Sequence, residues 1–113
     1  MEADKERINQ VISNLLSNSM QFTNDGHISL EMATNDQNNE VIVTVRDTGK
    51  GINPEIMPRL FSKFVTRSQQ GTGLGLFISK SIIEAHGGRI WAENNVLDGQ
   101  GTIFCFTLPL EII

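Results

Sequence analysis

The stretch Gly71-Thr72-Gly73-Leu74-Gly75-Leu76 constrains this chain most, because a glycine-rich segment runs directly into a helical pattern. Glycines before a helix expose backbone N–H groups at the positive end of the helix dipole, which suits a polyphosphate. Glycines beside a helix are also typical of plain turns, so both interpretations stay open here. Spacings of three and four predict a helix over 73–85 with one apolar face. That face comprises Leu74, Phe77, Ile78, Ser81, Ile82 and Ala85.

Length and charge limit the class of protein. A chain of 113 residues predicts a single domain over 1–113. A net charge of -4 argues against a nucleic-acid surface. Cys105 is the only cysteine and lies in an apolar run, which predicts a buried thiol and no internal disulfide. No membrane span or signal peptide is visible, so we expect a cytoplasmic domain, whether or not a longer protein is membrane-anchored.

A first helix is predicted over residues 4–22. Its apolar sector comprises Ile8, Val11, Ile12, Leu15, Leu16, Ser19 and Phe22. Glu6, Asn9, Ser13 and Ser17 fall on the opposite sector. A third sector is an amide-rich stripe of Arg7, Gln10, Asn14, Asn18 and Gln21. This stripe is either a polar surface edge or a row of neutral oxygen ligands facing a cleft.

Alternating residues predict strands over 27–33 and 41–45, which should pair as a hairpin. Further strands are predicted over 89–93 and 102–108, and a short fifth strand near either loop stays open. The order is therefore helix, hairpin, loop, helix and two strands. This order predicts a two-layer α/β sandwich, with a mixed, mostly antiparallel sheet and the helices packed on one face.

Two loops carry further signals. Asp47-Thr48-Gly49-Lys50-Gly51-Ile52 places a carboxylate at the end of a buried-looking strand, although Asp-x-Gly is equally typical of a turn. The segment of residues 53–70 is long and irregular, as lids often are.

Three familiar phosphate-binding signatures do not match this sequence. The dinucleotide pattern would need glycine at Leu76, the P-loop would need Ser or Thr at Gly51, and the kinase Asp-Phe-Gly is absent.

Four blocks in order nevertheless resemble one family. They are residues 14–23 (its N box), 47–52 (its first glycine box), 60–64 (its F box) and 71–76 (its second glycine box). Residues 84–93 and 101–104 are similar as well. The chain thus resembles the ATP-binding catalytic domain of sensor histidine kinases over almost its whole length. That family shares the Bergerat fold of the GHKL ATPases and kinases.

The resemblance implies ATP and Mg²⁺ as ligands. Asn18 corresponds to the magnesium ligand, with Asn14 supporting it, and Asp47 to the residue that accepts from the adenine amino group. Thr102 resembles a second adenine-side contact, and Lys63 or Arg67 is expected to reach the γ-phosphate. The full set of nucleotide-binding residues implied is Asn14, Asn18, Gln21, Phe22, Asp47, Gly49, Gly51, Ile52, Lys63, Phe64, Arg67, Gly71, Thr72, Gly73, Leu74, Gly75, Leu76 and Thr102.

The resemblance also implies partners. The phosphate acceptor is expected to be a histidine on a separate dimerisation domain, absent here, together with the general base. A response regulator is then an indirect partner. His27 and His86 lie outside any helical acceptor context, so we expect both to be structural and this chain to contain no catalytic residue. This fragment is expected to be monomeric and the intact protein homodimeric.

Two alternatives stay open. An ATP-driven clamp of the gyrase or Hsp90 kind usually has a glutamate in its first helix, whereas Glu6 here is on the opposite sector. A binding module without turnover is favoured only by Gln21, since the family usually has Lys or Arg there. Losing that cation is expected to weaken ATP binding unless Arg67 compensates.

Overall fold

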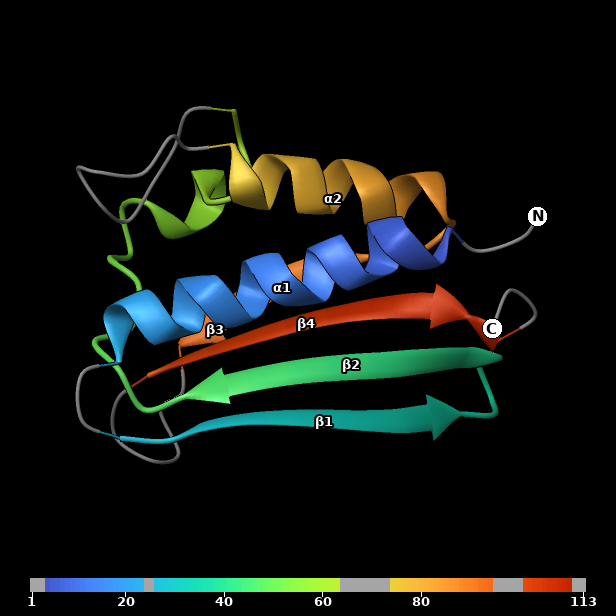
Figure 1. Cartoon of the computed structure of the whole chain (residues 1–113), viewed down its shortest axis with the longest axis horizontal. Helices are drawn as coiled ribbons and strands as arrows, with labels where there is room; N and C mark the ends of the chain where they lie inside the picture. Colours follow the sequence, from blue (N-terminus) through green and yellow to red (C-terminus); the bar gives the residue numbers. More distant parts are fainter. Residues whose placement is uncertain (1–3, 24–25, 64–73, 95–100, 111–113) are drawn as a thin grey trace.

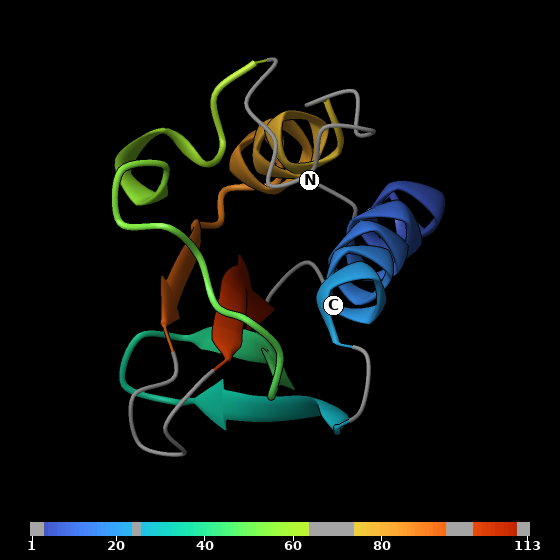
Figure 2. The ribbon, with the colours of Figure 1, turned by 90° about the vertical axis from the view of Figure 1, so that its left-hand side faces the viewer.

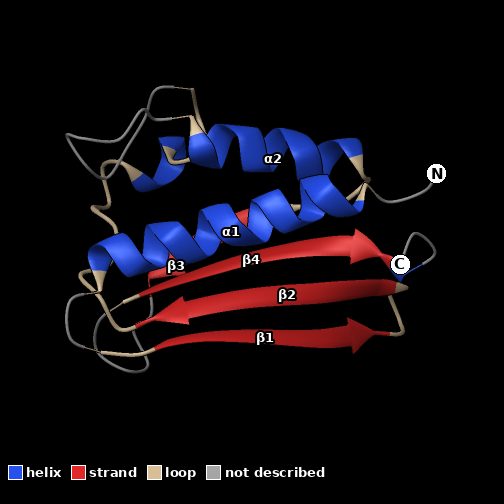
Figure 3. Cartoon of the chain, viewed as in Figure 1, coloured by secondary structure: helices blue, strands red, loops and turns tan. Residues whose placement is uncertain are grey.

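The computed structural model describes residues 4–23, 26–63, 74–94 and 101–110, excluding the Phe22 side chain. These residues form two layers, a four-stranded sheet and two helices on one of its faces (Figures 1, 2 and 3). The helices are α1 (Lys5–Phe22), α2 (Gly75–Ala85) and a short 3-10 helix, η1 (Met57–Arg59). The strands are β1 (Ile28–Asn35), β2 (Glu40–Asp47), β3 (Ile90–Asn94) and β4 (Thr102–Pro109).

The predicted two-layer α/β class is confirmed. The strand order is β1-β2-β4-β3, so the last strand lies between the hairpin and β3. All three pairings between these described strands are antiparallel, and the parallel pairing expected of a mixed sheet is not found among them. Because β4 is central, every residue from Thr102 to Leu108 is buried.

Helix α1 begins at a cap that satisfies its first turn. The Asp4 carboxylate accepts from the Arg7 backbone N–H at 3.1 Å, as an N-cap residue should. The predicted apolar sector is confirmed for Val11, Leu15 and Ser19, which are fully buried.

The start of α1 also makes a hydrogen bond with the end of α2. The Asp4 N–H donates to His86 Nε2 at 3.1 Å, and His86 Nδ1 lies 2.7 Å from the Ile82 carbonyl oxygen.

The buried face of α2 differs from the predicted one. Its buried residues are Leu76, Ser79, Ile82 and Ile83. Of the expected face only Ile82 is buried, and Ser81 and Ala85 are exposed. Three of the four buried residues are apolar, and Ser79 lies among them with its Oγ accepting from Asn14 Nδ2 on α1 at 3.2 Å. A serine therefore belongs to the packed face, which an apolar pattern cannot reveal. The helix ends at Gly87 with φ 81, as the predicted glycine cap requires.

The edge strand β1 is paired on one side by β2. Ile28, Leu30 and Met32 share one face, as the sequence predicts, since side chains alternate along a strand. The exposed fractions of Leu30 and Met32 are nevertheless 46% and 66%. Apolar alternation thus identified the strand, but its position at the sheet edge decided that this face is not fully covered.

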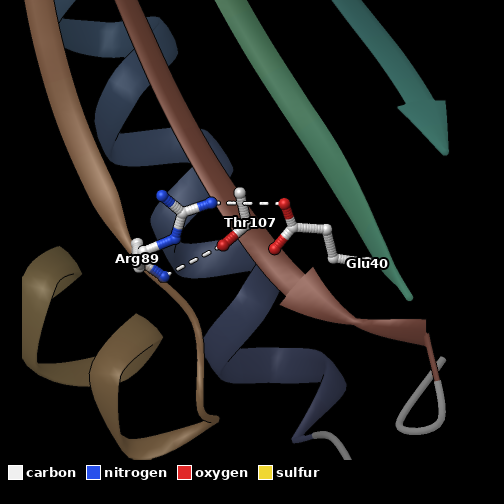
Figure 4. A network of polar contacts seen from close by, with 3 residues as sticks. All are labelled: Glu40, Arg89 and Thr107. Carbon is white, nitrogen blue, oxygen red and sulfur yellow. Dashed lines mark hydrogen bonds and ion pairs between the residues drawn. The ribbon is translucent and has the colours of Figure 1, made fainter. Parts of the chain in front are cut away.

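A polar network joins three strands on the sheet (Figure 4). Arg89, just before β3, donates from its backbone N–H to Thr107 Oγ1 at 3.1 Å, and its carbonyl accepts from the Thr107 N–H at 2.8 Å. Its guanidinium reaches Glu40 Oε1 on β2 at 3.2 Å. The Arg89 side chain is 65% exposed, so this ion pair adds little stability. The backbone contacts are what extend the β3–β4 pairing.

Cys105 is buried in β4, as predicted from its apolar run. Burial raises the pKa of this thiol, and the Thr44 hydroxyl 3.7 Å away lowers that pKa only in part. Because the thiolate is the reactive form, the native chain at pH 8 should react slowly with a thiol reagent and the urea-unfolded chain rapidly. Because folding disfavours the thiolate, the free energy of unfolding should also fall as the pH rises past about 8.5, the usual thiol pKa. Equal native and unfolded labelling rates would contradict this prediction.

Among the described residues, no helix is long and apolar enough to cross a membrane.

Candidate nucleotide-binding site

Asp47 ends β2 with a side chain that is 1% exposed. Its Oδ1 accepts from the backbone N–H groups of Gly49 at 2.9 Å and Thr102 at 3.1 Å. Its Oδ2 is buried and has no hydrogen-bond partner in the part of the chain that the structure describes. A buried acceptor left unpaired costs about 1–3 kcal/mol, so such an atom calls for a ligand or an ordered water. One oxygen thus fixes the carboxylate and the other is available to a bound group.

The loop after Asp47 is held by its neighbours. Thr48 and His27 exchange two hydrogen bonds, from the Thr48 N–H to the His27 carbonyl at 3.1 Å and from the His27 N–H to Thr48 Oγ1 at 2.9 Å. Asn94 at the end of β3 likewise exchanges two hydrogen bonds with Ile52. The Ile52 N–H donates to Asn94 Oδ1 at 2.8 Å, and Asn94 Nδ2 donates to the Ile52 carbonyl oxygen at 3.1 Å. Gly51, between them, has φ 80, which favours glycine. The loop is therefore shaped before any ligand arrives.

Gly101 completes this end of the sheet. Its φ is 133, and a Cβ added there would overlap the backbone carbonyl of Asp47. Only glycine therefore allows the start of β4 to approach Asp47 closely enough for the Thr102 N–H bond. Sequence reasoning assigned no role to Gly101 or Asn94. Gly101 lay within a stretch that resembles the family, whereas nothing in the local pattern singled out Asn94.

Asn14 and Asn18 occupy the middle of the amide stripe, and both are half-buried, whereas Gln21 is exposed. The Asn14 Nδ2 group donates to two atoms of α2, the Gly75 carbonyl oxygen at 3.3 Å and Ser79 Oγ at 3.2 Å. With the nitrogen directed at α2, the Asn14 carbonyl oxygen remains for other partners. The stripe thus meets the N-terminus of α2, which disfavours a plain solvated face for Asn14.

The segment before α2 packs against the core. Leu60 is 1% exposed. The Phe61 and Phe104 rings pack edge to face, with their centres 6.4 Å apart. Lys63 is exposed and its Nζ lies 5.9 Å from the centre of the Phe77 ring. Phe77 is in the first turn of α2, so Lys63 lies beside the same helix N-terminus.

Other expected binding residues fall into three groups. Ile52 and Leu76 are 4% and 8% exposed, so their side chains contribute to the core rather than to a ligand. Among the residues that the structure describes, a Cβ added at Gly75 would meet nothing within 4 Å, so packing against these residues does not explain that glycine. Six expected contacts lie outside what the structure describes. They are the Phe22 side chain and residues Phe64, Arg67, Gly71, Thr72 and Gly73.

Residues 4–23, 26–63, 74–94 and 101–110 contain no group of three or more His, Cys, Asp or Glu side chains able to hold a metal ion. A metal in the described part would therefore need neutral oxygen ligands and oxygens from a bound ligand. Asparagine carbonyl oxygens with phosphate oxygens and water are a set that suits Mg²⁺.

Comparison with known proteins identifies the family. Residues 3–112 match the family described as histidine kinase-, DNA gyrase B-, and HSP90-like ATPase. Because the match covers nearly the whole chain, this chain belongs to that family.

Its relatives are sensor kinases. The chain is 36% identical over 118 residues to the sensor histidine kinase WalK of Bacillus subtilis, covering 98% of this chain and 19% of that protein. It is 39% identical over 119 residues to the sensor protein kinase WalK of Staphylococcus aureus, covering 99% of this chain and 28% of that protein. The chain therefore spans about a fifth of the length of the first relative and just over a quarter of the second.

Solved structures of histidine kinases are similar to this chain in fold as well as in sequence. The nucleotide-free catalytic domain of the histidine kinase ThkA has a TM-score of 0.81 and 40% identity, covering 95% of this chain and 68% of that one. Full-length ShkA in complex with AMPPNP has a TM-score of 0.82 and 34% identity, covering 95% of this chain and 22% of that one. The first of these is a separately solved catalytic domain of which this chain spans about two-thirds.

Proposed function

We propose that this chain is the ATP-binding catalytic domain of a two-component sensor histidine kinase. It delivers the γ-phosphate of ATP to a histidine on a separate dimerisation domain. The observation that carries the proposal is the buried Asp47 carboxylate, with Oδ1 held by two backbone N–H groups and Oδ2 without a partner among the described residues. Family membership and the AMPPNP bound to the similar kinase ShkA support the choice of nucleotide.

Asp47 recognises the base. An ionised carboxylate only accepts hydrogen bonds, so Oδ2 suits the exocyclic amino group of adenine. Guanine has a carbonyl oxygen at that position. This oxygen and the carboxylate are both acceptors, so no hydrogen bond could form between them. The Thr102 N–H and the Gly49 N–H hold the carboxylate, so its orientation does not depend on the nucleotide. Recognition therefore uses a preformed acceptor.

The phosphates lie at the N-terminus of α2. Gly75 is its first residue, and no described residue lies within 4 Å of where its Cβ would stand, so a bulky ligand can come close to the backbone there. The helix dipole and bare N–H groups favour negative charge there. Lys63, beside Phe77, is the described cation that we assign to the same region. Arg67 and residues 71–73, outside the described part, complete the proposed contacts.

Mg²⁺ fits the asparagine pair. Asn18 is the proposed ligand through its side-chain oxygen, and Asn14, one turn earlier, is fixed by α2 and supports it. When bound, Mg²⁺ neutralises phosphate charge and orients the γ-phosphoryl group for transfer. The remaining work of this chain is positioning, because phosphoryl transfer needs few covalent steps from the protein. The acceptor histidine and the general base belong to the partner domain.

Calorimetric titration with Mg-ATP is the primary test of this proposal. We expect binding by the chain alone, without self-labelling. Mixing the chain with a histidine-bearing dimerisation domain and γ-labelled ATP should then label that domain, with label stable to alkali and labile to acid. Absence of ATP binding would refute the proposal. Binding without transfer to any acceptor would instead favour a nucleotide-binding module without turnover.

Asn18→Ala should remove most of the magnesium dependence of binding. If Asn18 is a ligand, the unchanged chain should bind ATP about tenfold more tightly with Mg²⁺ than without, and the variant nearly equally in both conditions. Asn9→Ala is the matched control, because Asn9 lies on the same helix but on the exposed opposite sector. Calorimetry with and without chelator measures two affinities for each of the three chains. Retained magnesium dependence in Asn18→Ala would disprove the metal assignment.

The clamp alternative receives no support from the first helix. Glu6 is exposed in the first turn of α1, on the sector opposite the apolar face and eight residues before Asn14. It is therefore not positioned to activate water beside Asn14 and Asn18, so we keep the kinase proposal.

A further inference from the structure

Three buried oxygen atoms have no hydrogen-bond partner within the described part of the chain. They are Ser19 Oγ, Thr23 Oγ1 and Asp47 Oδ2. Ser19 is 0% and Asp47 is 1% exposed, so bulk water does not satisfy them. Buried polar groups are almost always paired, so each of these atoms calls for a bound group or an ordered water as its partner. The Asp47 atom is already assigned to the base, whereas the Ser19 hydroxyl has no assigned role.

The three atoms belong to one end of the fold. Ser19 and Thr23 are four residues apart at the end of α1, so they lie on the same side of the chain there. Thr23 and Thr48 meet at Gly26, where an added Cβ would lie 3.3 Å from Thr23 Cγ2 and would overlap Thr48 Oγ1. Thr48 directly follows Asp47. Figure 1 shows the last turn of α1 above the end of β2.

Ser19 and Asp47 have complementary chemistry. A carboxylate can only accept a hydrogen bond, whereas a hydroxyl can also donate one. The Watson–Crick edge of adenine presents one donor, the amino group, beside one acceptor, ring nitrogen N1. Guanine presents the reverse order, a carbonyl acceptor beside an N–H donor. One acceptor and one donor on the protein therefore match adenine at both positions.

We infer that Ser19 is a second base-reading residue, whose hydroxyl donates to adenine N1 directly or through one bound water. This inference rests on the proposed ATP site and adds to it a residue that the amide stripe does not include. It gives a role to the hydroxyl at a fully buried position of the apolar face of α1, the face that also contains Val11 and Leu15.

Ser19→Ala should have opposite effects with and without nucleotide. Removing an unpaired buried hydroxyl should raise the Tm of the nucleotide-free chain, by roughly 3–6 °C for a domain of this size. Removing a donor to N1 should lower ATP affinity about fivefold to thirtyfold. A purely structural serine would change stability without this selective loss of affinity.

The closing experiment compares ATP with 1-deaza-ATP, in which a C–H group replaces N1. The unchanged chain should bind the analogue more weakly than ATP, whereas Ser19→Ala should bind the two about equally. Ser17→Ala, exposed on the opposite sector of the same helix, is the matched control and should change neither Tm nor affinity. An ATP affinity unaffected by Ser19→Ala, or an equal loss for both nucleotides, would overturn this inference alone. No ATP binding by the unchanged chain would overturn the proposed function together with it.

Discussion

Replacing Asp47 with asparagine should lower ATP affinity about tenfold to a hundredfold, equivalent to about 1–3 kcal/mol. The variant keeps an oxygen that can accept from the Gly49 and Thr102 N–H groups, so the fold should survive. The other position becomes an NH₂ group, which would face the adenine amino group as a second donor. The same NH₂ group can donate to the guanine carbonyl, so the preference for ATP over GTP should also narrow.

Calorimetric titration of both nucleotides measures this effect. Asp36→Asn is the matched control, since Asp36 is an exposed residue of the β1–β2 turn and carries the same change of charge. We expect the control to bind ATP like the unchanged chain. Equal losses in the two variants would mean that net charge, not base recognition, determines the affinity.

Gly101→Ala should cause the largest loss of stability at the site, roughly 2–5 kcal/mol, and with it the loss of ATP binding. The added methyl group would overlap the Asp47 backbone, and a φ of 133 is strained for any residue with a side chain. Both effects push the start of β4 away from Asp47. The Thr102 N–H would then no longer hold the carboxylate.

Gly88→Ala separates the site effect from the general effect of overlap. A Cβ at Gly88 would likewise overlap a backbone carbonyl oxygen, that of Thr107. Thr107 is five residues from Thr102 along β4, so this second overlap lies about 17 Å from the Thr102 N–H. Urea unfolding should show both variants destabilised. At a temperature where each remains folded, only Gly101→Ala should lose ATP affinity. Normal affinity in folded Gly101→Ala would refute the proposed coupling between Gly101 and Asp47.

Much of the fold followed from local patterns. Helix α1 was predicted within one residue of its observed start, because its apolar spacing is long and regular and Thr23 ends it. The four strands were recognisable from alternation and β-branched residues. The buried face of α2 was predicted wrongly, and its buried Ser79 bonds to Asn14, 65 residues away in sequence. Local periodicity contains no information about such a contact.

The candidate site divides in the same way. The sequence by itself determined its chemical groups: the Asp47 carboxylate, the two asparagines one turn apart and the glycines before α2. Only the tertiary structure decided which atoms of those groups are available. It directed the nitrogen of Asn14 to α2, held one oxygen of Asp47 with β4, and left Ser19 buried without a partner among the described residues. Hydrogen-bond satisfaction depends on atoms brought together from distant segments, so the type and spacing of residues cannot specify it.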